Sequence, residues 1–188
     1  MFYQIISFLL EVAATLIGGA CILRMYMGWR RMSMTNPVGR FVQALTDWLV
    51  LPLRRILPPR GQLDAASLLG AWLLKLAQYT MILLLLGGNA WGVLPVLALL
   101  GVAKLAVSVA TAVVLVAVIL SWAPNRSLIS DVFVRLSEPL LAPLRRIIPL
   151  IGGLDLSPLA LLVLLQVVSI ILGSAQASLL GGIVIGVA

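Results

Sequence analysis

Four polar side chains interrupt long apolar stretches of this sequence, and they are the residues best placed to do chemistry there. They are Glu11, Lys75, Lys104 and Gln166. If the stretches cross a membrane, a central charge costs about 2.5–3.5 kcal/mol on insertion scales, so such residues usually face protein and pair. We expect Glu11 to pair with Lys104 or Lys75. A path for ions or protons is the alternative use, which the single acidic residue among them disfavours.

Other reactive groups are scarce. The chain has no His and one Cys, Cys21, so the commonest general base and an internal disulfide are both absent. No phosphate-binding glycine loop, dinucleotide fingerprint or HExxH helix appears. Thioethers can bind Cu(I) or haem iron, but Met25, Met27, Met32 and Met34 are read as interfacial packing residues. The sequence predicts no catalytic residue, no metal site, no cofactor and no enzyme activity.

The composition indicates a membrane protein. Of 188 residues, 62% are hydrophobic and 10% charged, with a mean hydropathy of +1.17, whereas soluble domains are about 45–50% apolar and about 25% charged. Because Met1–Gln4 carries no Lys or Arg, the first apolar stretch is read as a span and not as a cleaved signal peptide. The predicted spans are Phe2–Leu23, Ala66–Leu86, Trp91–Trp122 and Leu156–Leu180.

The arginines lie mainly in two segments, and the connection between the second and third spans has none. Cytoplasmic loops are enriched in Lys and Arg, so both long loops are placed in the cytoplasm and both termini outside, in the cytoplasmic (inner) membrane. The charge of +7 is thereby explained as a topology signal, without nucleic acid. The arginines are Arg24, Arg30, Arg31, Arg40, Arg54, Arg55 and Arg60 in the first loop, and Arg126, Arg135, Arg145 and Arg146 in the second.

The two loops repeat one another. Residues 45–64 align without gaps with residues 136–155, and the same spacing aligns Lys75 with Gln166. Two units follow, 1–88 and 89–188, each with two spans and a basic loop. The structural positions that the copies share include Pro52, Pro58, Gly61 and Asp64 in the first, and Pro143, Pro149, Gly152 and Asp155 in the second.

The second copy resembles the repeat of the YggT family of membrane proteins. The resemblance rests on Ala123–Arg126, Ser137–Pro149, Gly152–Leu159 and Gln166, and it extends over nearly the whole chain. The first copy is more degenerate, with Trp48 at the position of Pro139. The resemblance implies roles suggested for relatives: tolerance of osmotic stress, assembly of cofactors onto membrane cytochromes, and organisation of division or nucleoids.

Each repeated loop is expected to lie on the membrane as an amphipathic segment. Within Ser137–Pro149 the leucines and isoleucines can share one side, while Arg145 and Arg146 reach lipid headgroups, as Arg54 and Arg55 would in the first copy. Each such charge is worth about 1 kcal/mol near an anionic surface. The arginines could instead only fix topology. Pro143 and Pro149 are expected to break the segment into short turns.

Asp64 and Asp155 stand just before the second span of each unit. We expect them to cap those helices, Asp155 together with Ser157. In the alternative, each carboxylate pairs with the arginine pair of its own loop. Gly152 supplies the turn into the span.

Together these features predict an all-α membrane protein, a compact bundle of four transmembrane helices in two tandem repeats with interfacial amphipathic segments. The repeats would be related by an axis along the membrane normal. The expected function is a non-enzymatic scaffold or assembly factor that docks anionic lipids of the bilayer, a membrane-protein partner or a further copy of itself. A transport-related role in osmotic stress or cation homeostasis is the alternative.

Overall fold

The computed structural model describes residues 2–58, 64–86, 91–122, 127–148 and 155–185. These residues are largely helical and contain no strand. The helices are α1 (Phe2–Trp29), α2 (Pro37–Ile56), α3 (Ala65–Leu86), the short 3₁₀ helix η1 (Trp91–Val93), α4 (Leu94–Ser121), α5 (Leu128–Arg145) and α6 (Ser157–Ile185). Within these ranges α1, α3, α4 and α6 are long and apolar enough to cross a membrane. The predicted all-α fold with four spans is confirmed.

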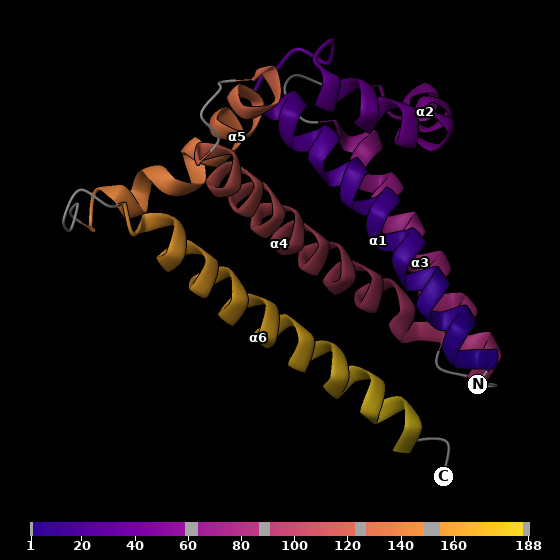
Figure 1. Cartoon of the computed structure of the whole chain (residues 1–188). Helices are drawn as coiled ribbons and strands as arrows, with labels where there is room; N and C mark the ends of the chain where they lie inside the picture. The colour runs from indigo at the N-terminus through magenta and orange to yellow at the C-terminus, as the bar shows by residue number, and fades with distance from the viewer. Residues whose placement is uncertain (1, 59–63, 87–90, 123–126, 149–154, 186–188) are drawn as a thin grey trace.

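The two basic loops lie at the same end of the molecule. Figure 1 shows α2 and α5 together at one end, while the N- and C-termini lie at the other. Each unit therefore runs as span, interfacial helix, span, and both units run in the same direction through the molecule.

The first span is longer than predicted. Helix α1 ends at Trp29, although the apolar run ends near Leu23. The charge of Arg24 does not end the helix, because its side chain is 2% exposed and is hydrogen-bonded to α2. A charge that finds its partner within the protein can stay inside a helix that continues.

Both interfacial helices begin at a capping side chain. Asn36 accepts a hydrogen bond from the N–H of Gly39 at 2.7 Å, and Pro37 takes the first position of α2. Ser127 accepts one from the N–H of Ser130 at 3.1 Å. A side-chain oxygen that binds a free N–H of the first turn fixes where a helix starts.

The expectation that Pro143 would break its segment into short turns was wrong. Helix α5 runs from Leu128 to Arg145 with Pro139 and Pro143 inside it, and α2 likewise contains Pro52. Proline removes one helical hydrogen bond and bends a helix, and the α5 ribbon changes direction along its length in Figure 1. Packing keeps the helix intact, since Leu136 and Leu141, on either side of Pro139, are both buried. Pro149 lies outside the described residues.

Helix α4 joins the two repeats. It contributes Val102 and Leu105 to a core cluster with α1, α2 and α3, and Val113 to a cluster with α1 and α5. Val114, on the next face, packs against α5 and α6. Every described core cluster therefore includes α4.

Helix α6 lies at the periphery, and the four spans do not close into the compact bundle that was expected. It packs against α4 and α5, and reaches α3 through a hydrogen bond from Gln176 to Tyr79 of 3.0 Å. In its most apolar stretch 6% of residues are buried, compared with 28–33% in the other spans. Figure 1 shows α6 separated from α1 by α4.

Candidate functional site: the basic end and the mid-span cavity

In the first repeat, Asp64 both caps a helix and pairs with an arginine. Its Oδ2 accepts hydrogen bonds from Arg54 Nη2 at 2.5 Å and from Ser67 Oγ at 2.7 Å. Its Oδ1 lies 3.4 Å from the Ser67 N–H at the start of α3. Capping and pairing with arginine, which the sequence offered as alternatives, therefore occur together. The Asp64 carboxylate caps the start of α3 and links the end of α2 to it.

The second repeat has the same Arg–Asp pair at the corresponding residues, and its aspartate caps the following helix through a serine at a different position. Asp155 Oδ1 accepts from the Ser157 N–H at 2.9 Å, and its Oδ2 accepts from Arg145 Nε at 2.8 Å. Arg145 also lies 3.4 Å from Glu138. The Asp155 side chain is 29% exposed, whereas that of Asp64 is 8% exposed. The duplicated ion pair is therefore better shielded from solvent in the first copy.

A buried arginine reinforces the first copy only. Arg24 Nη1 donates to Thr46 and to Asp47, each at 2.7 Å, and its Nε lies 3.9 Å from Asp64. Sequence reasoning placed Arg24 among the topology charges and missed this role. The signal was its position directly after an apolar run. Leu115 takes the corresponding place in the second repeat.

Hydrogen bonds to arginine and serine set the acidity of both aspartates. Burial alone would raise the pKa of Asp64, but hydrogen bonds from Arg54 and Ser67 outweigh it and hold the pKa below its ordinary value of 3.8. Ser157, whose N–H donates to Asp155, and then Arg145 lower the pKa of Asp155. Both carboxylates are charged at neutral pH, as the ion pairs require.

The second arginine of each pair has no partner in the part of the chain that the structure describes. Arg55 and Arg146 are exposed, and their guanidinium groups form no hydrogen bond or ion pair with the residues that the structure describes. Each Pro-Leu-Arg-Arg motif thus divides its two charges, because Arg54 and Arg145 hold the fold while the following arginines project from it. Of the shared structural positions, Pro52 and Pro58 are exposed in and after α2, whereas Gly61 and Gly152 lie outside the described residues.

Apolar side chains also project from α2. It buries Val42, Thr46 and Val50, and leaves Phe41 and Trp48 at 65% and 60% exposed. Large exposed apolar side chains next to arginines are typical of a helix lying in the interface of a bilayer.

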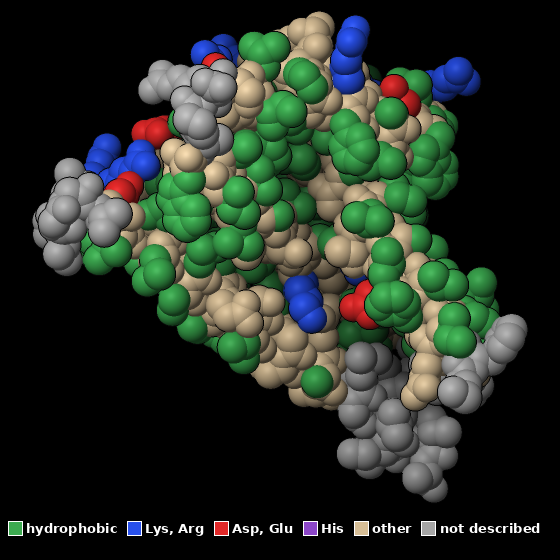
Figure 2. Space-filling view, in the orientation of Figure 1, with side chains coloured by type: hydrophobic (Ala, Val, Ile, Leu, Met, Phe, Trp, Pro, Cys, Tyr) green, Lys and Arg blue, Asp and Glu red, His purple; other side chains and the backbone are tan. Residues whose placement is uncertain are grey.

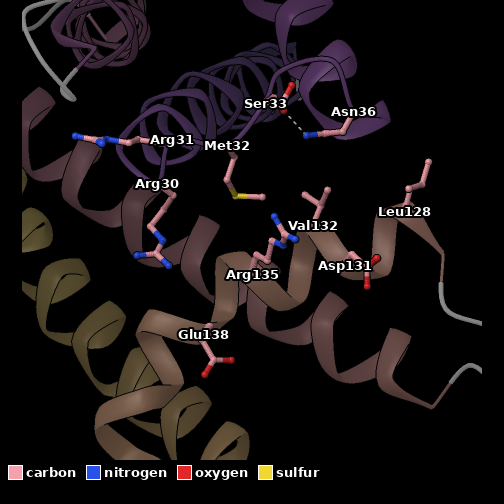
Figure 3. Close-up of a pocket in the computed structure, with 10 residues that line it drawn as sticks. All are labelled: Arg30, Arg31, Met32, Ser33, Asn36, Leu128, Asp131, Val132, Arg135 and Glu138. Atoms are coloured by element: carbon pink, nitrogen blue, oxygen red, sulfur yellow. Dashed lines mark hydrogen bonds between the residues drawn. The ribbon is translucent and has the colours of Figure 1, made fainter.

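A basic pocket of about 660 Å³ lies between the end of α1 and α5. Its lining carries a formal charge of +1, from three arginines and the two acidic residues Asp131 and Glu138. Figure 3 shows Arg30, from the α1 side, and Arg135, from α5, approaching it from different elements. Neither guanidinium has a partner among the described side chains, and the Glu138 carboxylate in Figure 3 is turned away from Arg135. The sequence contained the Arg30-Arg31 dipeptide, but nothing in it indicated that Arg135 would lie opposite.

An apolar groove of about 860 Å³ adjoins this pocket. It runs between α1 and α4 and is closed at one end by α2 and α5, with Leu16, Val113 and Phe133 among its lining residues. The groove and the pocket meet at the start of α2, where Asn36 lines the pocket and Pro37 lines the groove. A cationic pocket next to an apolar groove matches the two ends of an anionic phospholipid.

A polar cavity of about 360 Å³ lies among the spans, and Glu11, Lys75 and Lys104 all line it. Figure 2 shows Lys and Asp/Glu side chains in a hollow of an otherwise apolar face. Lys75 is buried and donates to Gln78 at 2.8 Å. The expected pairing is not formed, because Glu11 has no ion pair within 4.0 Å to any residue that the structure describes.

Gln166 does not line this cavity and is exposed on α6. The polar residue that α6 supplies there is Gln176. Gly101 makes room on α4, since a Cβ at that position would lie 3.1 Å from the Tyr79 ring and 3.2 Å from Lys75. Among the described residues no group of three or more His, Cys, Asp or Glu could hold a metal ion.

Two tandem units of span, interfacial helix and span, each closed by its own Arg–Asp pair, define a class of multi-pass helical membrane proteins with an internal repeat. The chain belongs to the CCB3/YggT family. The sequence model of that family matches residues 3–85 and 96–176, one segment for each unit. The predicted family is confirmed.

Its relatives extend over almost the whole chain. It is 34% identical to the uncharacterised protein YggT of Escherichia coli over 168 residues, 87% of each chain. It is 37% identical to an uncharacterised Vibrio alginolyticus protein encoded in the proC 3' region, over 171 residues that cover 89% of this chain and 92% of the relative. A Pseudomonas aeruginosa relative is 31% identical over 183 residues. No solved structure matches the chain significantly.

Proposed function

We propose that this protein is a non-enzymatic membrane scaffold whose two repeated interfacial helices bind anionic phospholipid at the cytoplasmic face. The observation that carries the proposal is that the two arginines of each repeated pair differ in their contacts. Arg54 and Arg145 are held by Asp64 and Asp155, while the next residue of each pair is exposed and has no partner among the described residues. A topology signal would need no such repeated geometry.

The basic pocket and the apolar groove support the same proposal. A phosphate headgroup would accept hydrogen bonds from Arg30 and Arg135, and the acyl chains would fill the groove between α1 and α4. Since guanidinium binds phosphate through parallel hydrogen bonds, arginine suits this headgroup better than lysine does. Lipid held at both interfacial helices would give a partner protein a fixed platform, which is the basis of an assembly role.

The test compares the intact chain with the Arg55→Gln/Arg146→Gln double variant in nanodiscs of defined lipid. At about 1 kcal/mol for each charge, the variant should bind anionic phospholipid about 30-fold more weakly, measured by native mass spectrometry and lipid titration. Binding of zwitterionic phospholipid serves as the control and should not change. Equal affinity of both proteins for anionic lipid would reject the proposal.

The same variant separates lipid from protein as the partner. In-membrane crosslinking of wild type and variant would identify neighbouring proteins. Loss of a protein neighbour with unchanged lipid affinity would reassign Arg55 and Arg146 to a protein interface and contradict the lipid proposal.

The mid-span cavity is the observation that favours the alternative, a transport-related role in osmotic or cation homeostasis. Its two lysines and one glutamate give it an excess positive charge, which opposes cation passage. Reconstituted liposomes would show whether K⁺ or Na⁺ flux depends on Lys75. Flux that is abolished in Lys75→Gln would favour transport over a scaffold.

A further inference from the structure

The cavity among the spans leaves two charges exposed where the protein meets lipid. Glu11 and Lys104 both lie well inside their helices, far from either end, and both side chains are exposed. Lys75, in the same cavity, is buried and has Gln78 as its partner. The exposed pair therefore differs from Lys75 in having neither burial nor a partner among the described residues.

Lipid is an unfavourable neighbour for these two groups. Charged side chains at this depth normally face protein or water and pair with a group of opposite charge. Figure 2 shows the hollow opening on an apolar surface, so the charges are visible from outside the protein. A partner that covers this opening would supply what the single chain lacks.

We propose that the partner is a second copy of this chain, docked across the opening so that Glu11 of each copy pairs with Lys104 of the other. A twofold contact brings the same surface together from both sides, so it requires a surface complementary to itself. The two exposed charges of the cavity, the Glu11 carboxylate and the Lys104 ammonium, meet that requirement, whereas exposed charges of one sign would repel those of the copy. The proposal does not depend on lipid binding at the other end of the molecule.

The surroundings of the opening allow close approach. A Cβ added at Gly173 of α6 would lie 3.9 Å from Lys104 Nζ, and the next residues on this face, Ser174 and Ala177, are small and exposed. Small side chains let transmembrane helices come close together. On α1, Phe8 is 63% exposed one turn before Glu11 and provides apolar contact area.

The test uses two differently tagged copies of the full chain, co-expressed and captured by one tag after reconstitution into liposomes. Wild-type copies should capture each other. Glu11→Lys and Lys104→Glu should each fail to capture themselves, because the two exposed charges at the opening then have the same sign. The mixture of the two variants should associate again, since both contacts then join opposite charges. Glu11→Gln should raise the dissociation constant of the dimer about tenfold or more, the scale of a lost charge-assisted contact.

The mixed pair separates contact between copies from contact within one. If Glu11 and Lys104 paired within a chain, mixing two single variants could not rescue either. Gln166→Leu, at an exposed polar residue of α6 outside the cavity, is the matched control and should dimerise as wild type does. A monomeric wild type, or variants that accumulate normally without rescue in the mixture, would overturn the proposal.

Discussion

Asp64 and Asp155 each cap a helix and pair with an arginine, but they differ in burial. Their substitution should therefore lower the stability of the protein by different amounts. Asp64 is mostly buried and lies near Arg24 as well as Arg54, whereas the pair of Asp155 is partly open to solvent. Breaking a shielded pair costs more than breaking an exposed one. We expect Asp64→Asn to lower the free energy of unfolding by about 2–3 kcal/mol, and Asp155→Asn by less than about 1 kcal/mol.

Steric-trapping or denaturant titrations in bicelles would measure both values. The two substitutions are chemically identical and lie at equivalent positions, so each controls for the other. A larger loss at Asp155 would mean that exposure does not determine the strength of this pair.

The lowered pKa values of both aspartates give the pH dependence of stability a definite sign. As pH falls, the unfolded chain takes up protons first, at the ordinary value of 3.8, while the folded chain resists. The stabilisation is therefore complete above this value and is lost as pH falls through the lower folded pKa. Thermal unfolding between pH 3 and pH 7 should show this loss, and it should be smaller in Asp64→Asn.

The contacts of a single residue could be predicted where its partner lies nearby in the sequence, or where the same pair of residues recurs in the second repeat. Capping and pairing of the aspartates were both anticipated, because Arg54 and Asp64 recur at the same spacing in Arg145 and Asp155. The role of Arg24 was not, since Thr46 and Asp47 lie far along the chain and no second copy of the contact exists.

At the scale of the helices, the start of α2 depends on a glycine. A Cβ at Gly39 would lie 2.7 Å from the backbone of Met34, which cannot move aside as a side chain can. We expect Gly39→Ala to lower the free energy of unfolding by about 1–3 kcal/mol, the usual cost of overpacking, and to shift the start of α2. Hydrogen exchange at α2 and a denaturant titration would detect it.

Gly28 provides the matched control for this substitution. A Cβ there would meet nothing within 4 Å, and the residue lies near the end of α1. Gly28→Ala should be neutral or slightly stabilising, because alanine favours helix. Equal destabilisation by both variants would argue against a specific clash at Met34.

The prolines show where reasoning about single elements failed. Local rules treat proline as a helix breaker, and they predicted turns at Pro143. Within α5 the buried residues before Pro139 contact α1 and α4, and buried Leu141 after it contacts α4 and α6. Packing over two surfaces outweighs the local cost, and no local pattern could indicate it.

For the whole molecule, the arrangement predicts which positions face the same side of the membrane. Thr35, before α2, and Leu128, at the start of α5, are exposed at one end, and Gly92 is exposed between α3 and α4. With Cys21 replaced by Ala, single cysteines at Thr35 and Leu128 should react with an impermeant maleimide only from the cytoplasmic side. A cysteine at Gly92 should react only from the outside.

Labelling intact spheroplasts and inverted vesicles gives the two sides separately. Reaction of Thr35→Cys and Leu128→Cys from opposite sides would contradict the tandem arrangement itself.

The spans and their common direction could be predicted because apolar length and arginine placement act over each segment independently. The open position of α6 could not, since in lipid an apolar helix gains little from facing protein instead of acyl chains. The alignment of the repeats places Gln166 at the position of Lys75, but the residue of α6 that lines the cavity is Gln176. The repeat relates sequence positions, but α3 and α6 have different neighbours.

The missing counterpart of Arg24 gives the two halves different mechanical freedom. Helix α2 is held to α1 near its middle by the charged hydrogen bonds of Arg24, and to α3 at its end by Arg54. Leu115 stands where α4 would need an arginine, so the middle of α5 is held by one neutral hydrogen bond, from the Tyr26 hydroxyl of α1 to the Leu136 carbonyl oxygen, and its end by Arg145. A load applied to the surface of the protein should therefore detach the middle of α5 from the spans before it detaches that of α2.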